Sequence, residues 1–99
     1  MKLILLMPVL ATLLASAAQA APAPTTEQRY ARTCGNCHEQ GTFMAPRRGD
    51  KTAWAPRLRQ GEDVLLAHTK NSYKMMPARG MCSDCTDAEF KALIRYMAR

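Results

Sequence analysis

Two cysteines and a histidine lie within five consecutive residues, Cys34-Gly35-Asn36-Cys37-His38. C-x-x-C-H is the pattern of covalent attachment of haem c. Each thiol would form a thioether with one haem vinyl group, and the histidine that follows would place an imidazole beside the iron. The spacing therefore predicts one covalently bound haem c, with Cys34 and Cys37 as attachment points and His38 as an iron ligand.

Two other uses of a C-x-x-C pair fit the sequence less well. A thioredoxin-like redox pair is expected beside a βαβ unit, and no segment here alternates as a strand should. A zinc site would have to combine this pair with Cys82 and Cys85, which are much farther away than the roughly 15–20 residues usual between such pairs.

An electron-transferring haem iron needs a sixth ligand, and several downstream side chains could supply one. The candidates are Met44, His68, Met75, Met76, Met81 and Met97. Met97 falls on the apolar face of the last expected helix, and His68 lies on an expected helix beside Leu65, so both are expected to pack or lie at the surface. Met76 is favoured over Met75 because Pro77 biases the residue before it to an extended backbone.

A second cysteine pair, Cys82-Ser83-Asp84-Cys85, has the same spacing but is followed by Thr86 instead of histidine. It is therefore not a second haem site. In an exported protein this pair favours a disulfide that closes a very small loop. A redox-active dithiol, as in thiol–disulfide proteins, is the alternative.

The N-terminus resembles a secretory signal peptide. Met1-Lys2 supplies a basic start, an apolar stretch follows from Leu3 to Ala15, and Ala18-Gln19-Ala20 offers a signal-peptidase site. We expect cleavage after Ala20, a short leader over residues 21–25 and one domain over residues 26–99. The mature protein is then expected in the periplasm, without stable membrane insertion, because the apolar run is shorter than the roughly 20 residues of a membrane span.

The remaining domain is small and basic. A chain this short usually needs a disulfide, metal or cofactor to stabilise its core. The formal net charge of the whole chain is +6, and the basic residues are scattered, with no nucleic-acid-binding run. Positive charge could steer the protein toward an acidic face on a redox partner, or simply solvate the surface. Cations in the two long loops are expected beside the haem edge: Arg47, Arg48, Lys74 and Arg79.

The expected secondary structure is entirely helical. Thr25 and Gln28 fit a capping box for a helix reaching about residue 34, and Thr86 and Glu89 fit another for the last helix. That last helix has one apolar face, formed by Phe90, Leu93, Ile94 and Met97. Two short helices are expected between these, one from Asp50 through Trp54 that Pro56 interrupts, and one over about residues 62–68. Residues 35–49 and 71–85 are expected to be loops.

Taken together, these motifs resemble the class I c-type cytochromes and, more narrowly, the cytochrome c5 family. The resemblance covers about residues 30–97. The segments that carry it are Cys34-Gly35-Asn36-Cys37-His38, Ala45-Pro46, Lys51-Thr52-Ala53-Trp54-Ala55-Pro56-Arg57, Met76-Pro77, Cys82-Ser83-Asp84-Cys85 and Tyr96-Met97.

This resemblance implies a small all-α fold around one haem c, with the first and last helices packed crosswise. It implies His38 and Met76 as axial ligands, a Cys82–Cys85 disulfide, and a hydrogen bond from the free ring nitrogen of His38 to the Pro46 carbonyl. It also implies a one-electron carrier between redox enzymes of a respiratory chain, not an enzyme. A haem domain that binds or senses a small ligand is the alternative function.

Two residues near the expected haem, and two departures from the family pattern, add to these expectations. Trp54 and Arg57 could reach a haem propionate, with ordinary packing as the alternative. Met44 replaces a glycine that is usual in the family. The segment Asn71-Ser72-Tyr73-Lys74-Met75 replaces a commonly glycine-rich stretch before the axial methionine, so bulkier side chains are expected near the haem edge.

Overall fold

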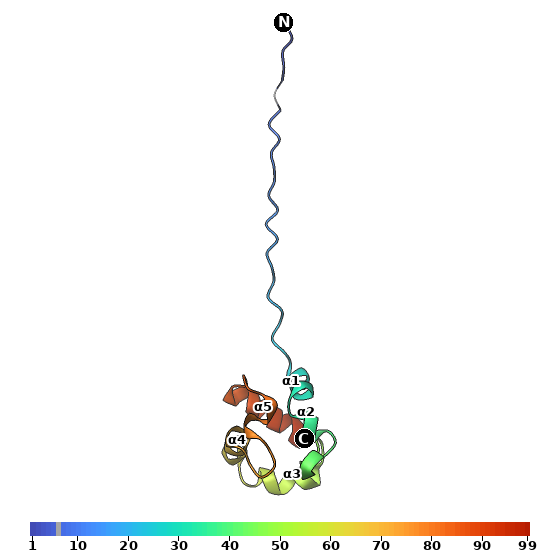
Figure 1. Ribbon diagram of the computed structural model, residues 1–99, viewed down its shortest axis with the longest axis vertical. Coiled ribbons are helices and arrows are strands. Elements are labelled where there is room, and N and C mark those ends of the chain that lie inside the picture. Colours follow the sequence, from blue (N-terminus) through green and yellow to red (C-terminus); the bar gives the residue numbers. More distant parts are fainter. Residues whose placement is uncertain (6) are drawn as a thin grey trace.

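A computed structural model describes residues 1–5 and 7–99 of the chain. Within these residues, every regular element is a helix, and Figure 1 shows the helices gathered into one body. The elements are α1 (Thr26–Arg32), α2 (Gly35–His38), the 3₁₀ turn η1 (Thr42–Met44), α3 (Lys51–Leu58), α4 (Glu62–Asn71), the 3₁₀ turn η2 (Ala78–Met81) and α5 (Asp87–Ala98). The predicted all-α fold is confirmed.

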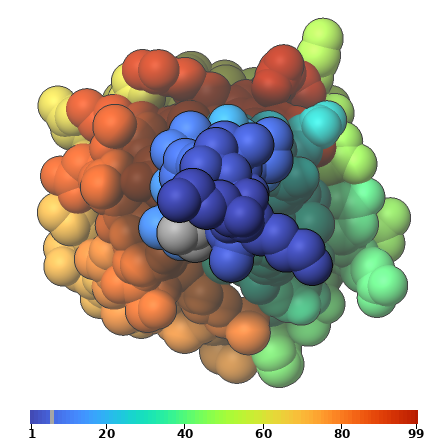
Figure 2. Space-filling view, turned by 90° about the horizontal axis from the view of Figure 1, so that it is seen from above, coloured from blue at the N-terminus to red at the C-terminus, as the bar shows by residue number. Residues whose placement is uncertain are grey.

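The N-terminal segment lies apart from this body. Residues 1–5 and 7–25 have no regular secondary structure and extend away from α1 (Figure 1). Figure 2, which looks along the molecule from above, shows this segment projecting in front of the helices. Leu6, inside the expected signal peptide, lies outside the described residues. Among the helices that the structure describes, none is long and apolar enough to cross a membrane.

The first and last helices each begin at a residue whose side chain caps the helix N-terminus. The Thr25 hydroxyl accepts from the Gln28 backbone N–H at 3.1 Å, and the Gln28 side chain accepts from the Thr25 N–H at 3.0 Å, which completes the predicted capping box. At α5 the Thr86 hydroxyl accepts from the Glu89 N–H at 3.2 Å. The Glu89 carboxylate accepts from the Thr86 hydroxyl at 3.1 Å and also pairs with Arg29. It does not accept from the Thr86 backbone N–H, so only half of the second predicted box forms.

The core lies along α5. The four residues predicted to form its apolar face are buried: Phe90, Leu93, Ile94 and Met97. On the neighbouring side α1 contributes Tyr30, whose ring meets Tyr96 of α5 edge-on, with 5.1 Å between ring centroids. This packing sets α1, and therefore the haem motif that follows it, against α5.

Several of the expected boundaries are wrong. Helix α4 continues beyond residue 68 to Asn71, and the expected loop over residues 71–85 contains η2. The segment expected to be a loop over residues 35–49 contains α2 and η1, which are too short for a periodic pattern to reveal. Helix α3 continues through Pro56 to Leu58. Pro56 lacks the N–H that would bond to the Thr52 carbonyl, but both residues are exposed, so water can hydrate that carbonyl.

Candidate haem-binding site

The C-x-x-C-H motif is folded into a single helical turn. The backbone N–H groups of Cys37 and His38 both donate to the Cys34 carbonyl, at 3.2 and 2.9 Å. Residues three and four apart share one face of a helix, so the three side chains project to the same side. Cys34 and His38 are buried, and Cys37 is half-buried. Neither cysteine takes part in a disulfide.

A glycine inside the motif permits this turn to lie against α1. A Cβ added at Gly35 would lie 2.9 Å from the Tyr30 carbonyl oxygen and 3.2 Å from a ring carbon of Tyr30. Any larger residue would push the turn away from α1. Gly35 therefore sets how closely the cysteines approach the core.

The His38 ring is held in one tautomer. Its Nδ1 lies 2.7 Å from the Pro46 carbonyl oxygen. A carbonyl only accepts hydrogen bonds, so Nδ1 carries the proton and Nε2 keeps its lone pair free. Burial lowers the pKa of His38, the Pro46 bond opposes this, and the charge of Arg57 lowers it further. A neutral imidazole with a free Nε2 is the form that binds a metal.

The loop that carries Pro46 is anchored at both ends. The Arg47 guanidinium donates twice to the Gln40 carbonyl, at 3.1 and 2.8 Å. The Trp54 indole N–H donates to the Arg47 carbonyl at 2.8 Å, and the Trp54 ring stacks near His38 with 5.8 Å between centroids. Because this N–H is the only donor of the indole, Trp54 supports the loop and not a propionate.

Arg57 lies on the same side of α3 as Trp54, and one of its nitrogens bonds to the backbone of the same helix. Its Nη1 donates to the Ala53 carbonyl at 2.6 Å. The remaining donors of the guanidinium have no protein acceptor among the described residues. The predicted propionate contact from Arg57 therefore stays a prediction, whereas Trp54 follows the packing alternative.

The methionines differ sharply in exposure. Met44, Met75 and Met81 are 92, 65 and 63% exposed, and Met97 is in the core. Met76 is half-buried, and its Cε lies 3.0 Å from where a Cβ at Gly80 would stand. Gly80 thus leaves room for the Met76 side chain.

The remaining candidate ligand, His68 of α4, faces a different partner. Its ring stacks on Tyr73 with 3.8 Å between centroids and 8° between planes.

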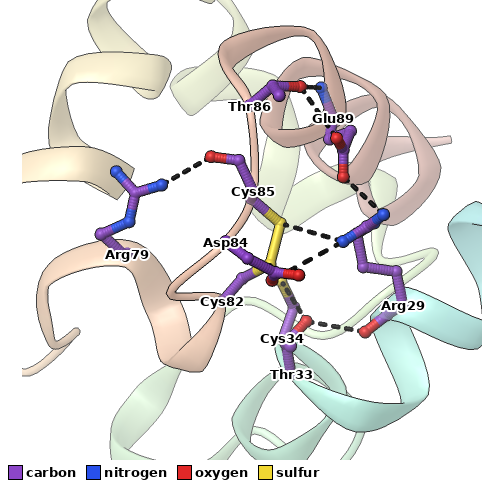
Figure 3. A network of polar contacts seen from close by, with 9 residues as sticks. All are labelled: Arg29, Thr33, Cys34, Arg79, Cys82, Asp84, Cys85, Thr86 and Glu89. Carbon is purple, nitrogen blue, oxygen red and sulfur yellow. Dashed lines mark hydrogen bonds and ion pairs between the residues drawn. A yellow bond between two sulfur atoms is a disulfide. The ribbon is translucent and has the colours of Figure 1, made fainter.

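The second cysteine pair forms a disulfide at the start of α5, with 5.5 Å between the Cα atoms of Cys82 and Cys85. The two residues are 1 and 4% exposed. Figure 3 shows the Arg29 guanidinium lying among the disulfide, Asp84 and Glu89. Sequence reasoning missed Arg29, which ties α1 to both the disulfide and α5, because only its position in the fold reveals that role.

Three of the four cations predicted to guide a partner donate hydrogen bonds within the protein: Arg47, to the Gln40 carbonyl, Arg48 and Arg79. Arg48 forms a two-pronged pair with Glu39, at 3.0 Å each, and holds the pKa of that carboxyl down at about 2, with help from Tyr30. Arg79 is half-buried, donates to the Cys85 carbonyl (Figure 3) and lies 5.0 Å from the centre of the Phe90 ring. Lys74 lies over the Tyr73 ring and has no acidic partner among the described residues.

Comparison with known proteins matches this geometry to a family. A family model described as cytochrome c oxidase, cbb3-type, subunit III matches residues 21–97. Cytochrome c-555 of Chlorobaculum tepidum is 42% identical over 72 residues, which cover 69% of this chain and 67% of the relative. Cytochrome c5 of Azotobacter vinelandii is 41% identical over 70 residues, which cover 69% of this chain and 84% of the relative. The chain belongs to the cytochrome c5 family of class I c-type cytochromes.

Solved structures agree with this assignment. A mono-haem ferrocytochrome c from Shewanella putrefaciens superposes with a TM-score of 0.70 at 38% identity, over 79% of this chain and 96% of that one. A chain in the crystal structure of an electron transfer complex of nitrite reductase with cytochrome c superposes with a TM-score of 0.68 at 41% identity, over 78 and 98% of the two chains. This cytochrome carries one covalent haem c and is a one-electron carrier, not an enzyme.

Proposed function

We propose that Cys34 and Cys37 attach the haem of this cytochrome, and that His38 and Met76 are its axial ligands. The observation that carries the proposal is the hydrogen bond between His38 Nδ1 and the Pro46 carbonyl, which leaves Nε2 free on the face shared with both thiols. When bound, the haem supplies an iron that alternates between the ferric and ferrous states. The protein residues exclude water and keep the ligands fixed.

Burial of His38, Cys34 and the neighbouring core residues suits such a carrier. A ligand set that stays the same in both oxidation states limits reorganisation, and methionine ligation raises the reduction potential. The half-buried position of Met76, with the space left at Gly80, supports it over the exposed Met75.

We also propose that the chain is exported to the periplasm after loss of residues 1–20, which leaves a leader over residues 21–25 and the haem domain over residues 26–99. The family match from residue 21 and the first helix at Thr26 support these boundaries. An oxidising compartment would maintain the Cys82–Cys85 disulfide, which fixes the chain between the methionine loop and α5. Burial of both sulfurs argues against thiol–disulfide exchange, because a thiolate must be accessible to attack.

The partners we propose are redox proteins with an acidic docking face, among them a nitrite reductase as electron acceptor. The solved complex of nitrite reductase with a cytochrome c that resembles this chain supports that class of partner. Lys74, which has no acidic partner within residues 1–5 and 7–99, supports approach to an acidic surface.

The ligand assignment is tested on the holoprotein matured in a bacterial periplasm. The mature protein should contain one haem per chain, and its ferric form should show the far-red charge-transfer band of methionine bound to iron. Met76→Ala should abolish this band, and Met75→Ala should retain it. A wild-type protein without the band would instead favour a ligand-binding haem domain, and loss of the band only in Met75→Ala would make Met75 the ligand.

A further inference from the structure

The loop that carries Met76 contains two residues whose backbone conformations favour glycine. Ser72 has φ 76° and ψ 147°, and Lys74 has φ 51°. Non-glycine residues occupy such conformations only where surrounding contacts hold them. Opening of the loop would release this backbone strain, so other contacts must hold the loop closed.

Two backbone hydrogen bonds close the loop at Tyr73 and Met76. The Met76 N–H donates to the Tyr73 carbonyl at 2.9 Å, and the Tyr73 N–H donates to the Met76 carbonyl at 3.2 Å. The Ser72 hydroxyl also donates to the Met76 carbonyl, at 3.0 Å. The backbone of Met76 is therefore held by Ser72 and Tyr73.

Tyr73, in turn, is held by the helix before it. Its ring lies flat on the His68 imidazole, 3.8 Å between centroids and 8° between planes, and Lys74 lies over the ring at 5.3 Å. His68 belongs to α4, which packs against η2 and α5. The stack is thus the side-chain contact that connects the strained turn to the rigid part of the fold.

We propose that the His68–Tyr73 stack is a latch that keeps the Met76 loop closed, and that both residues position the axial ligand without touching the iron. This inference rests on the proposed role of Met76 as ligand. It gives the bulky segment Asn71 to Met75, where a glycine-rich stretch is common, a definite purpose. The side chains that strain the turn also supply the ring that closes it.

Imidazole added to the ferric holoprotein provides the test, because it binds iron only when Met76 has left. Its apparent affinity therefore rises in proportion to the fraction of protein with an open loop. Loss of an aromatic stack should raise that affinity by about 2- to 10-fold. Tyr73→Leu and His68→Leu each replace one ring of the stack with an aliphatic side chain, and Tyr73→Phe keeps the stack. Val64→Ala, at an exposed position of the same helix, is the matched control.

We expect tighter imidazole binding in Tyr73→Leu and in His68→Leu, and no further gain in the double variant, because the two residues act through one contact. Tyr73→Phe and Val64→Ala should bind imidazole as the wild type does. Wild-type affinity in both leucine variants would overturn the latch, as would an equal gain in Tyr73→Phe, which would assign the effect to the hydroxyl. If one leucine variant does not fold, the other decides.

Failure of the latch and failure of the ligand assignment give different results. A wild-type far-red band that Met76→Ala abolishes, together with leucine variants that bind imidazole normally, would remove only the latch. A wild-type protein without the band, or a Met76→Ala variant with unchanged imidazole affinity, would remove the ligand assignment and the latch with it.

Discussion

The Pro46 carbonyl oxygen accepts a hydrogen bond from His38 Nδ1 at 2.7 Å, and the same loop is held from the other side by Trp54, which donates to the next carbonyl, that of Arg47. One indole therefore supports the peptide segment that orients the imidazole. Its ring also stacks beside that imidazole. The contacts of Trp54 extend from α3 to His38, the proposed ligand, through a single loop.

Trp54→Phe should loosen this support. The phenylalanine keeps most of the buried ring but removes the N–H, and loss of one buried hydrogen bond costs about 1 kcal/mol, with a further cost for the carbonyl left unpaired. We expect a lower free energy of unfolding of the holoprotein in denaturant and faster solvent exchange of the His38 Nδ1 proton. Tyr73→Phe, which changes a side chain away from this loop, is the comparison variant. Unchanged proton exchange in Trp54→Phe would contradict the supporting role.

Gly35→Ala tests how tightly the haem motif packs on α1. The added Cβ would meet the Tyr30 carbonyl oxygen at 2.9 Å, which is backbone and cannot rotate away. Overpacking of this kind costs about 1–3 kcal/mol. Thermal or denaturant unfolding of the holoprotein should show this loss, whereas Ser83→Ala at an exposed position should stay within about 0.5 kcal/mol of the wild type. Equal stability of the two variants would mean that the turn moves freely.

The sequence predicts the parts of this fold that depend on local pattern. The Thr25 capping box, the apolar face of α5 and the haem motif each consist of residues close together in the chain, so spacing alone indicates them. The predicted end of α3 was wrong. Pro56 lies near the exposed C-terminal end of the helix, where the loss of its backbone hydrogen bond costs little.

Contacts between distant segments were beyond sequence reasoning. Nothing in the spacing of Arg29 and Glu89 shows that they pair across α1 and α5. The indole of Trp54 likewise found its acceptor on Arg47 in the fold, and Arg79 turned inward to the Cys85 carbonyl. Such choices depend on tertiary packing, where a buried donor takes the nearest acceptor.

The buried phenol of Tyr30 predicts a pH dependence at the alkaline end. It donates to Glu39 at 2.5 Å, and burial first, then the bond to Glu39, raise the pKa of Tyr30 to about 12. The folded pKa thus exceeds the ordinary value of about 10. Its contribution to stability is fully present below pH 10 and is lost as the pH rises toward 12.

The Tyr30→Phe variant should not show this loss of stability at alkaline pH. The difference in free energy of unfolding between the wild type and the variant, measured at several values from about pH 8 to 12, should shift in favour of the variant above pH 10. Taking the difference cancels the effects of the other titrating groups. A difference that stays constant over this range would show that the Tyr30 phenol does not titrate with folding.

The final prediction concerns docking and separates Lys74 from Arg79. Lys74 has no acidic partner in the described chain and lies in the loop of the proposed axial ligand, whereas Arg79 donates to the Cys85 carbonyl. Lys74→Glu should therefore slow association with an acidic redox partner, such as a nitrite reductase, and leave the haem spectrum unchanged. The association rate of the wild type should fall as salt rises, because added ions screen exposed charges over about 10 Å at 0.1 M.

Lys91→Glu, at a cation paired with Asp63, is the control and should have a smaller effect. Stopped-flow mixing at several ionic strengths measures both rates. A rate that is flat in salt, or equally slowed by the two variants, would leave the charge of Lys74 without a role in docking.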